Sequence, residues 1–156
     1  MRTLYILRVI VVSVETLILA GAWLAFVYFE SELESLASSL SLNNEVLNYL
    51  MLLPTVLAAW IINEIRVLLQ EDKETIRILT NWADYWRLKI HTWTSLGFAG
   101  LFTIMSFLPW VVKSGIGTGT GLLLFVASLV GQLCLAISVY AARIRVKEII
   151  AHVKVP

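Results

Sequence analysis

Residues 118–142 read TGTGLLLFVASLVGQLCLAISVYAA and contain no charged side chain. At a rise of about 1.5 Å per residue, a helix of this length crosses the hydrocarbon core of a bilayer, which is about 30 Å thick. The basic residues Arg143, Arg145 and Lys147 follow directly. Lysine and arginine accumulate at the cytoplasmic ends of membrane helices, so this stretch predicts a transmembrane helix that ends in the cytoplasm.

Three further apolar stretches have the length of a membrane span: about 4–29, 46–69 and 92–112. The last of these contains no charge, whereas the first contains Arg8 and Glu15. Only 15% of the chain is charged and 59% is hydrophobic, while soluble domains carry about 25% charged residues. The sequence therefore predicts an all-α membrane protein, in which residues 1–156 form a single domain of four transmembrane helices.

The basic residues favour one side of this arrangement. Eleven of the twelve lie in the first eight residues, from Arg66 to Lys89, or from Arg143 onward. The segment after the first span instead carries four acidic residues and no basic one: Glu30, Glu32, Glu34 and Glu45. The positive-inside rule thus predicts that both termini are cytoplasmic. Because we find no sorting signal, we expect a bacterial inner membrane.

The connection between the second and third spans, about 67–91, has apolar residues at helical spacing on one side and charged residues on the other. This pattern predicts an amphipathic cytoplasmic helix that continues into the third span. Aromatic and basic residues gather where it meets the membrane: Trp82, Tyr85, Trp86, Arg87, Lys89 and His91. Such a cluster is typical of an interfacial belt that faces lipid headgroups. The alternative is a control surface for a cytoplasmic partner or signal.

Glu15 is the sharpest candidate for a functional residue. It follows Leu4 by eleven residues, which places it about 16 Å deep and near the bilayer midplane. A charged side chain there costs about 2.5–3.5 kcal/mol. Gln132 has a similar depth on the fourth span, so one interpretation is an interhelical hydrogen bond between the two. The other is that Glu15 lines a pore or binds a proton or cation.

Arg8 and Glu64 form a second polar set near the cytoplasmic boundary. Their spans run in opposite directions and both residues have a comparable depth, which predicts an ion pair between them. Asn63 and Arg66 are further candidate members. One face of the first helix would carry Arg8 and Glu15 together with Val12, Leu19 and Ala22. In an oligomer that face would present a basic ring and a carboxylate ring to a shared axis.

The fourth span carries small residues on one stripe: Ala127, Gly131, Cys134 and Ser138. Small residues at this spacing allow helix backbones to approach closely, so the stripe predicts a packing face, either within the chain or between chains. As the only cysteine, Cys134 can form neither an intrachain disulfide nor a redox pair. The chain shows no catalytic arrangement and no metal-ligand spacing. We therefore expect no cofactor, no metal site and no nucleic-acid partner, and an enzyme is not favoured.

A chain of four membrane helices with a glutamate in the middle of the first resembles the small multidrug-resistance exporters, through Glu15 and the helix count. The resemblance implies a dimer in which this carboxylate binds protons and cationic drugs. The long connection 67–91 departs from that family, whose loops are short. The same two features resemble calcium-release-activated channels, in which a glutamate lies on the pore-lining first helix.

Three hypotheses for function follow. The favoured one is a homo-oligomeric membrane protein that forms an ion or small-cation channel or transport unit, with Glu15 as its intramembrane site. The alternative is a non-conducting accessory or scaffold subunit of a larger membrane complex. The third is a membrane-disrupting effector of the holin or defence type. The expected partners are the lipid bilayer and further copies of the chain.

Overall fold

The computed structural model describes residues 9–40, 44–70, 73–82, 84–111 and 115–154. These residues form six α-helices and no strand. In chain order the helices are α2 (Val14–Tyr28), α3 (Glu30–Ser39), α4 (Asn44–Gln70), α5 (Lys73–Asn81), α6 (Tyr85–Val111) and α7 (Gly119–Lys154). The prediction of an all-helical fold is therefore confirmed.

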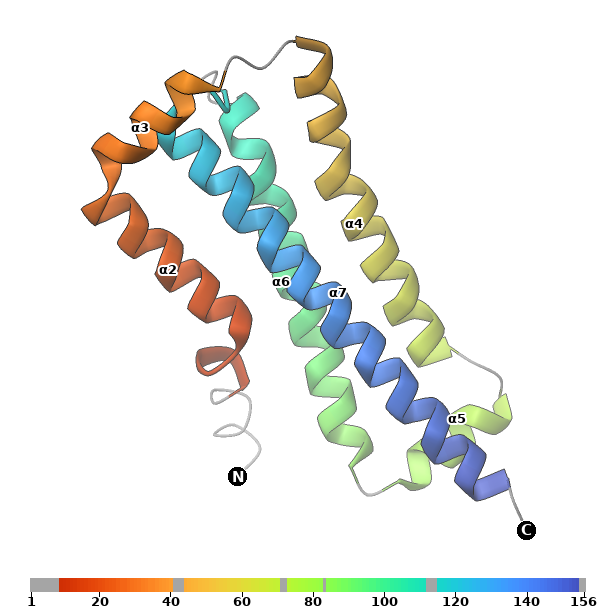
Figure 1. Ribbon diagram of the computed structural model, residues 1–156. Coiled ribbons are helices and arrows are strands. Elements are labelled where there is room, and N and C mark those ends of the chain that lie inside the picture. Colours follow the sequence, from red (N-terminus) through yellow and green to blue (C-terminus); the bar gives the residue numbers. More distant parts are fainter. Residues whose placement is uncertain (1–8, 41–43, 71–72, 83, 112–114, 155–156) are drawn as a thin grey trace.

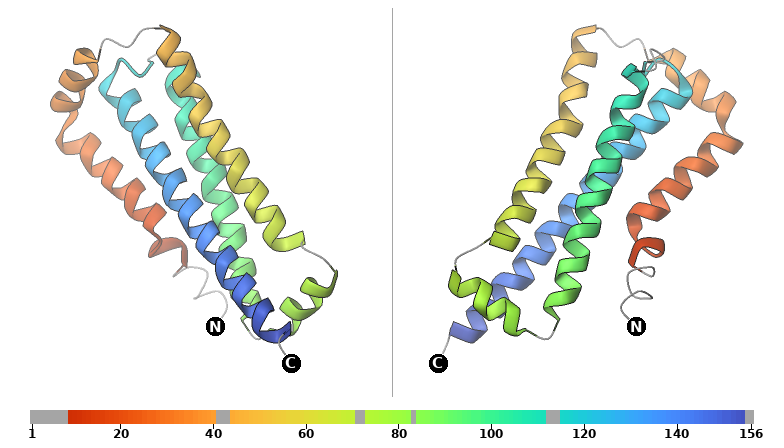
Figure 2. Two further views of the ribbon diagram at one scale, coloured as in Figure 1. Left: turned by 45° about the vertical axis from the view of Figure 1, so that its right-hand side comes forward. Right: turned by 180° about the vertical axis from the view of Figure 1, so that it is seen from behind.

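Helix α7 is the central element of the fold and contacts every other described helix. It runs antiparallel to α6, and α2 and α4 lie on opposite sides of this pair (Figure 1; Figure 2). The start of α2, helix α5 and the C-terminal end of α7 share one end of the bundle. We name this the basic end, since Arg87, Arg143 and Arg145 lie there, and we name the opposite end, which carries α3, the acidic end.

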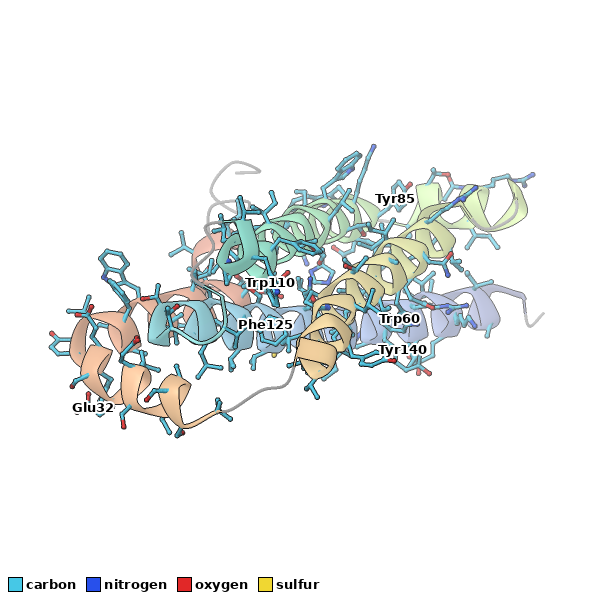
Figure 3. All side chains as sticks on the ribbon, turned by 90° about the horizontal axis from the view of Figure 1, so that it is seen from above. Glu32, Trp60, Tyr85, Trp110, Phe125 and Tyr140 are labelled. Atoms are coloured by element: carbon cyan, nitrogen blue, oxygen red, sulfur yellow. The ribbon has the colours of Figure 1, made fainter. Side chains whose placement is uncertain are left out.

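The main core lies where α4, α6 and α7 meet. On α4 the buried apolar residues follow each other at steps of four and three: Pro54, Ala58, Ile61, Ile65 and Leu68. This spacing places them on one helical face. Phe102 of α6 and Leu135 of α7 complete the centre of the core and are fully buried. Toward the acidic end, Trp110 packs edge-on against Phe125, with ring centroids 5.5 Å apart (Figure 3).

Large apolar side chains also cover the outside of the bundle, such as Leu17, Trp23, Val56 and Ile137. A soluble monomer rarely exposes so much contiguous apolar surface. Among the described residues, α6 and the Gly119–Ala151 part of α7 are long and apolar enough to cross a membrane, and α2 with α3 adds a third span if this bent pair is one broken span. The structure thus supports a membrane protein with two or three candidate spans, where the sequence predicts four.

The first span is not the continuous helix over 4–29 that the sequence predicts. Helical backbone ends at Val11, and α2 begins only after Ser13, whose backbone is extended with φ −75° and ψ 152°. The 15 residues of α2 extend about 22 Å, which is shorter than the hydrocarbon core. The next helix, α3, bends away from α2 by 92°. Because of the break, Val12 and Glu15 do not lie on one continuous helical face.

Helix α3 packs on the N-terminal end of α7 at the acidic end. Its Ala37 is buried, and the Glu34 carboxylate accepts a hydrogen bond of 2.7 Å from the backbone N–H of Gly119. A carboxylate at this position also interacts favourably with the partial positive charge of a helix N-terminus. A β-carbon on Gly119 would lie 2.7 Å from the backbone nitrogen of Glu34, so this close approach requires glycine.

The connection between α4 and α6 contains the predicted helical segment, but as a separate helix. Helix α5 ends at Asn81, and α6 begins at Tyr85 after a turn. The apolar face of this region is buried against its own bundle in a second core cluster of Leu68, Leu79, Leu88 and Val146. A helical pattern predicts an apolar face but not the element against which that face packs. Here hydrophobic packing holds this segment against α7.

Candidate functional site

The break in the first span determines the surroundings of Glu15. The Ser13 Oγ accepts a hydrogen bond of 3.2 Å from the backbone N–H of Thr16 and so caps the start of α2. The Thr16 hydroxyl donates back to the carbonyl oxygen of Ile10. Glu15 therefore lies in the first turn of α2, where the exposed N–H groups and the helix dipole favour a negative charge.

Glu15 lines a cleft of about 470 Å³ between the start of α2 and the helices α6 and α7. The carboxylic residue itself is only 8% exposed. Much of the remaining lining has hydroxyl or imidazole groups: Ser13, His91, Thr94, Ser95 and Ser138. A carboxylate, an imidazole and several hydroxyls facing one space can exchange protons and can replace part of the hydration shell of a small cation. We name this space the Glu15 cleft.

His91 joins the two long helices at this cleft. Its Nε2 atom lies 3.3 Å from the Ser138 Oγ, and the tautomer of the ring decides which of the two atoms donates. Glu15 and His91 both line this cleft, so the two side chains face one space. The sequence pattern assigns His91 to the interfacial belt. In the structure His91 is half-buried and lines the Glu15 cleft, nearly two helical turns after the start of α6.

A second cleft, of about 540 Å³, adjoins the Glu15 cleft on the side of the basic end. The two clefts share Val9, His91 and Ser138 in their linings. The second cleft is bordered by the aromatic and charged residues Trp82, Asp84, Arg87 and Arg145. The two clefts are therefore adjacent and lie one after the other between the basic end of the bundle and Glu15. We name the second space the basic cleft.

Gln132 is not the hydrogen-bond partner of Glu15. It is fully buried, and its Nε2 donates a hydrogen bond of 3.0 Å to the Thr103 hydroxyl, which joins α7 to α6. Its Oε1 atom is buried without a hydrogen-bond partner among the described residues. The interhelical polar contact expected for Gln132 therefore exists, but with a threonine on another helix. Periodicity could not distinguish the two, since the rotation of α7 about its axis decides which helix Gln132 faces.

Glu64 pairs with a residue that the sequence pattern did not single out. The Arg143 Nη1 lies 2.6 Å from the Glu64 Oε2, and the Glu64 side chain is 9% exposed. The predicted partner, Arg8, lies outside the described residues, and Asn63 is exposed. One signal for Arg143 was available, since it is the first charge after the fourth apolar stretch and lies at the same end as Glu64.

The other residues of the predicted control surface differ in their environments. Trp82 and Tyr85 pack against the second core cluster. Arg87 forms an exposed ion pair of 3.2 Å with Asp84, and its guanidinium lies 5.5 Å from the centre of the Trp86 ring. Lys89 is exposed. Trp82 and Tyr85 thus have a packing role here, whereas Asp84 and Arg87 line the basic cleft and Lys89 does not.

The small-residue stripe of α7 divides into two parts. Ala127 and Gly131 are buried, and a β-carbon on Gly131 would lie 2.4 Å from the Phe102 ring, so this part packs on α6 within the chain. Cys134 and Ser138 instead line the Glu15 cleft. The stripe is therefore an intrachain packing face at the acidic half and a cleft wall at the basic half.

Within the described residues, no group of three or more histidine, cysteine, aspartate or glutamate side chains is positioned to hold a metal ion. Comparisons with models of known protein families, with characterised proteins and with solved structures found no match to this chain. Function is therefore inferred from the Glu15 cleft itself.

Proposed function

We propose that this chain is an integral membrane protein that binds a proton or a small cation at Glu15 and moves it across the membrane as part of a homo-oligomer. The observation that carries the proposal is a buried carboxylate in a cleft that hydroxyl groups and an imidazole partly line, within an apolar bundle. A carboxylate at this depth is costly unless water, a cation or a hydrogen-bond donor compensates for it. Membrane proteins generally retain such groups for function.

The size of the Glu15 cleft supports this proposal. A cavity needs about 10–15 Å³ to hold a water molecule, and the cleft of about 470 Å³ exceeds that many times. Water in the cleft would solvate the carboxylate and would bring protons or cations to it. The basic cleft continues the path toward the end of the bundle that we place in the cytoplasm, with both termini, because the basic residues gather there.

Assembly is part of the proposal because the polar path ends within one protomer. Beyond Glu15, the Ile18 and Leu19 side chains of α2 pack against the main core. Farther toward the acidic end, the space between α2, α6 and α7 is a cavity of about 330 Å³ lined almost entirely by apolar groups. Passage across the whole bilayer therefore requires a second protomer or a movement of α2. The proposal also keeps a bacterial inner membrane and four spans, in which α4 is a membrane span in addition to the α2–α3 pair, α6 and α7.

An accessory-subunit role is the second candidate, and one surface favours it. A β-carbon added at Gly97 or Gly100, on the outside of α6, would meet no atom within 4 Å, although small residues on membrane helices commonly contact another helix. The same surface suits contact between copies of this chain. Cross-linking at Gly97 in membranes, with a cysteine there and Cys134 replaced by serine, identifies whether the neighbour is a second copy or another protein.

Reconstitution in liposomes tests the proposal directly. We expect cation or proton flux from the wild-type protein, and a decrease of about tenfold or a changed selectivity with Glu15→Gln, because the neutral amide loses the electrostatic attraction for a cation. Glu32→Gln is the matched control, since Glu32 is exposed and points away from the bundle (Figure 3). Wild-type flux equal to that of protein-free liposomes, in a sample shown to be oligomeric, would exclude the proposed transport.

A further inference from the structure

The basic cleft has the features of a site for a phosphate group. Two guanidinium groups border it, from Arg87 in the first turns of α6 and from Arg145 on α7. Guanidinium groups bind phosphate through paired N–H donors in a fixed fork geometry. The opposing carboxylate is Asp84, so the cleft carries one more positive charge than negative charge before His91 is counted. Its volume of about 540 Å³ lies in the range of ligand-binding cavities.

The existing ion pair leaves both arginines able to engage a ligand. Arg87 and Asp84 have side chains that are 54% and 46% exposed, and exposed pairs contribute little to stability. Arg145 forms no ion pair with another described residue and is exposed. A phosphate between the two arginines would therefore replace solvent and would compete with the exposed Arg87–Asp84 ion pair.

The position of the cleft favours a lipid over a soluble ligand. Trp82 lines the cleft and Tyr85 packs against the neighbouring core cluster, and tryptophan and tyrosine accumulate at the depth of the lipid headgroups. The basic cleft also adjoins the Glu15 cleft, one wall of which is apolar through Val12, Phe98 and Ile137. A phospholipid could thus place its phosphate between the arginines and one acyl chain along that wall.

We infer that the basic cleft binds the phosphate headgroup of an anionic phospholipid, held by Arg87 and Arg145. Basic pockets between membrane helices on the cytoplasmic side are suited to such headgroups. An acyl chain in the adjoining space would cover Glu15, so the lipid would regulate access to that residue. The regulatory part rests on the proposed function, whereas lipid binding does not depend on transport.

Native mass spectrometry of the full chain in detergent measures this binding directly. The protein is titrated with phosphatidylglycerol and, separately, with phosphatidylcholine. We expect phosphatidylglycerol to bind about tenfold more tightly, and Arg87→Gln/Arg145→Gln to remove that preference, because two charge-assisted hydrogen-bonding groups are lost. Lys89→Gln/Lys147→Gln is the matched control, since it removes two exposed positive charges from the same helices outside the cleft. It should retain the preference.

A variant that is expected to strengthen lipid binding distinguishes loss of the binding site from misfolding of the protein. Asp84→Asn removes the carboxylate that competes for Arg87, so it should strengthen phosphatidylglycerol binding by about twofold to fivefold. Equal loss in both double variants would overturn the inference, because it would assign the preference to general surface charge. Glycerol 3-phosphate that binds as tightly as phosphatidylglycerol would overturn the assignment to a lipid. Failure of transport in liposomes with lipid binding intact would refute only the regulatory part.

Discussion

Arg143 donates a hydrogen bond from Nη1 to the Glu64 Oε2 across 2.6 Å and joins α7 to α4 at the basic end. The pair closes the side of the bundle opposite α2, and Glu64 would be a nearly buried, uncompensated charge without it. The Arg143 Nε is buried without a hydrogen-bond partner among the described residues, so this ion pair is the main compensation of both side chains. This contact and three others can each be tested through stability or packing.

Loss of one partner of this pair should destabilise the protein strongly. Arg143→Gln leaves the Glu64 carboxylate buried and unpaired, which costs about 3–5 kcal/mol for fully buried pairs and less here, because Arg143 is 27% exposed. Arg143→Gln/Glu64→Gln should recover part of the loss. Unfolding in detergent by increasing denaturant measures both effects. Lys147→Gln, on the same helix but exposed, is the control, and an Arg143→Gln protein as stable as this control would contradict the prediction.

A methyl group on Gly131 should disturb the contact between α6 and α7. The Phe102 ring would lie within 2.6 Å of the added β-carbon, and this ring is fully buried and cannot move freely. Gly131→Ala should therefore lower stability by about 1–3 kcal/mol. Gly97→Ala is the matched control on α6, where nothing lies within 4 Å, and alanine there should be neutral or stabilising. Equal thermal stability of the two variants would disprove the close contact.

Undocking of α3 is expected from a change at Gly119. Gly119→Ala brings a β-carbon within 2.8 Å of the α3 backbone, so α3 should separate from α7 while the rest of the bundle remains folded. Hydrogen exchange of the α3 amides, followed by mass spectrometry, should become faster. Glu34→Ala should have a weaker effect of about 1 kcal/mol, because it removes only the carboxylate cap. Gly117→Ala, where no atom lies within 4 Å, should leave the exchange unchanged.

The buried amide of Gln132 should be replaceable without a loss of stability. Its Oε1 has no hydrogen-bond partner among the described residues, and a buried unsatisfied polar atom costs about 1–3 kcal/mol. Gln132→Leu should therefore keep or raise the unfolding temperature, since the Thr103 hydroxyl still donates to the carbonyl oxygen of Ala99. A large decrease would indicate that Oε1 has a partner in the membrane-embedded protein, such as bound water. Leu135→Ala, at a fully buried apolar position, provides the reference for a destabilised core.

Several elements agree closely with expectation from periodicity alone. The apolar stretch at 46–69 corresponds to α4 at Asn44–Gln70, and the amphipathic pattern within 67–91 corresponds to α5. Both depend on local spacing of apolar residues, which a helix converts directly into a buried face. The break before α2 was not predicted. A hydropathy profile does not detect this break, because Ser13 lies inside an apolar run. The Ser13 hydroxyl accepts a hydrogen bond from the backbone N–H of Thr16 and caps the start of α2.

Composition and residue order alone determine the apolar stretches typical of a membrane protein, the all-helical class and the grouping of basic residues toward one end. These properties follow from the lengths of the apolar stretches and from the positions of the basic residues at their ends, both of which can be read directly along the chain. The partners of Glu64, Gln132 and His91 emerge only in three dimensions. Each depends on how far a helix rotates about its axis and slides past its neighbours. Packing of Phe102 against Gly131 and the capped break at Ser13 decide that rotation and offset, and no linear pattern encodes them.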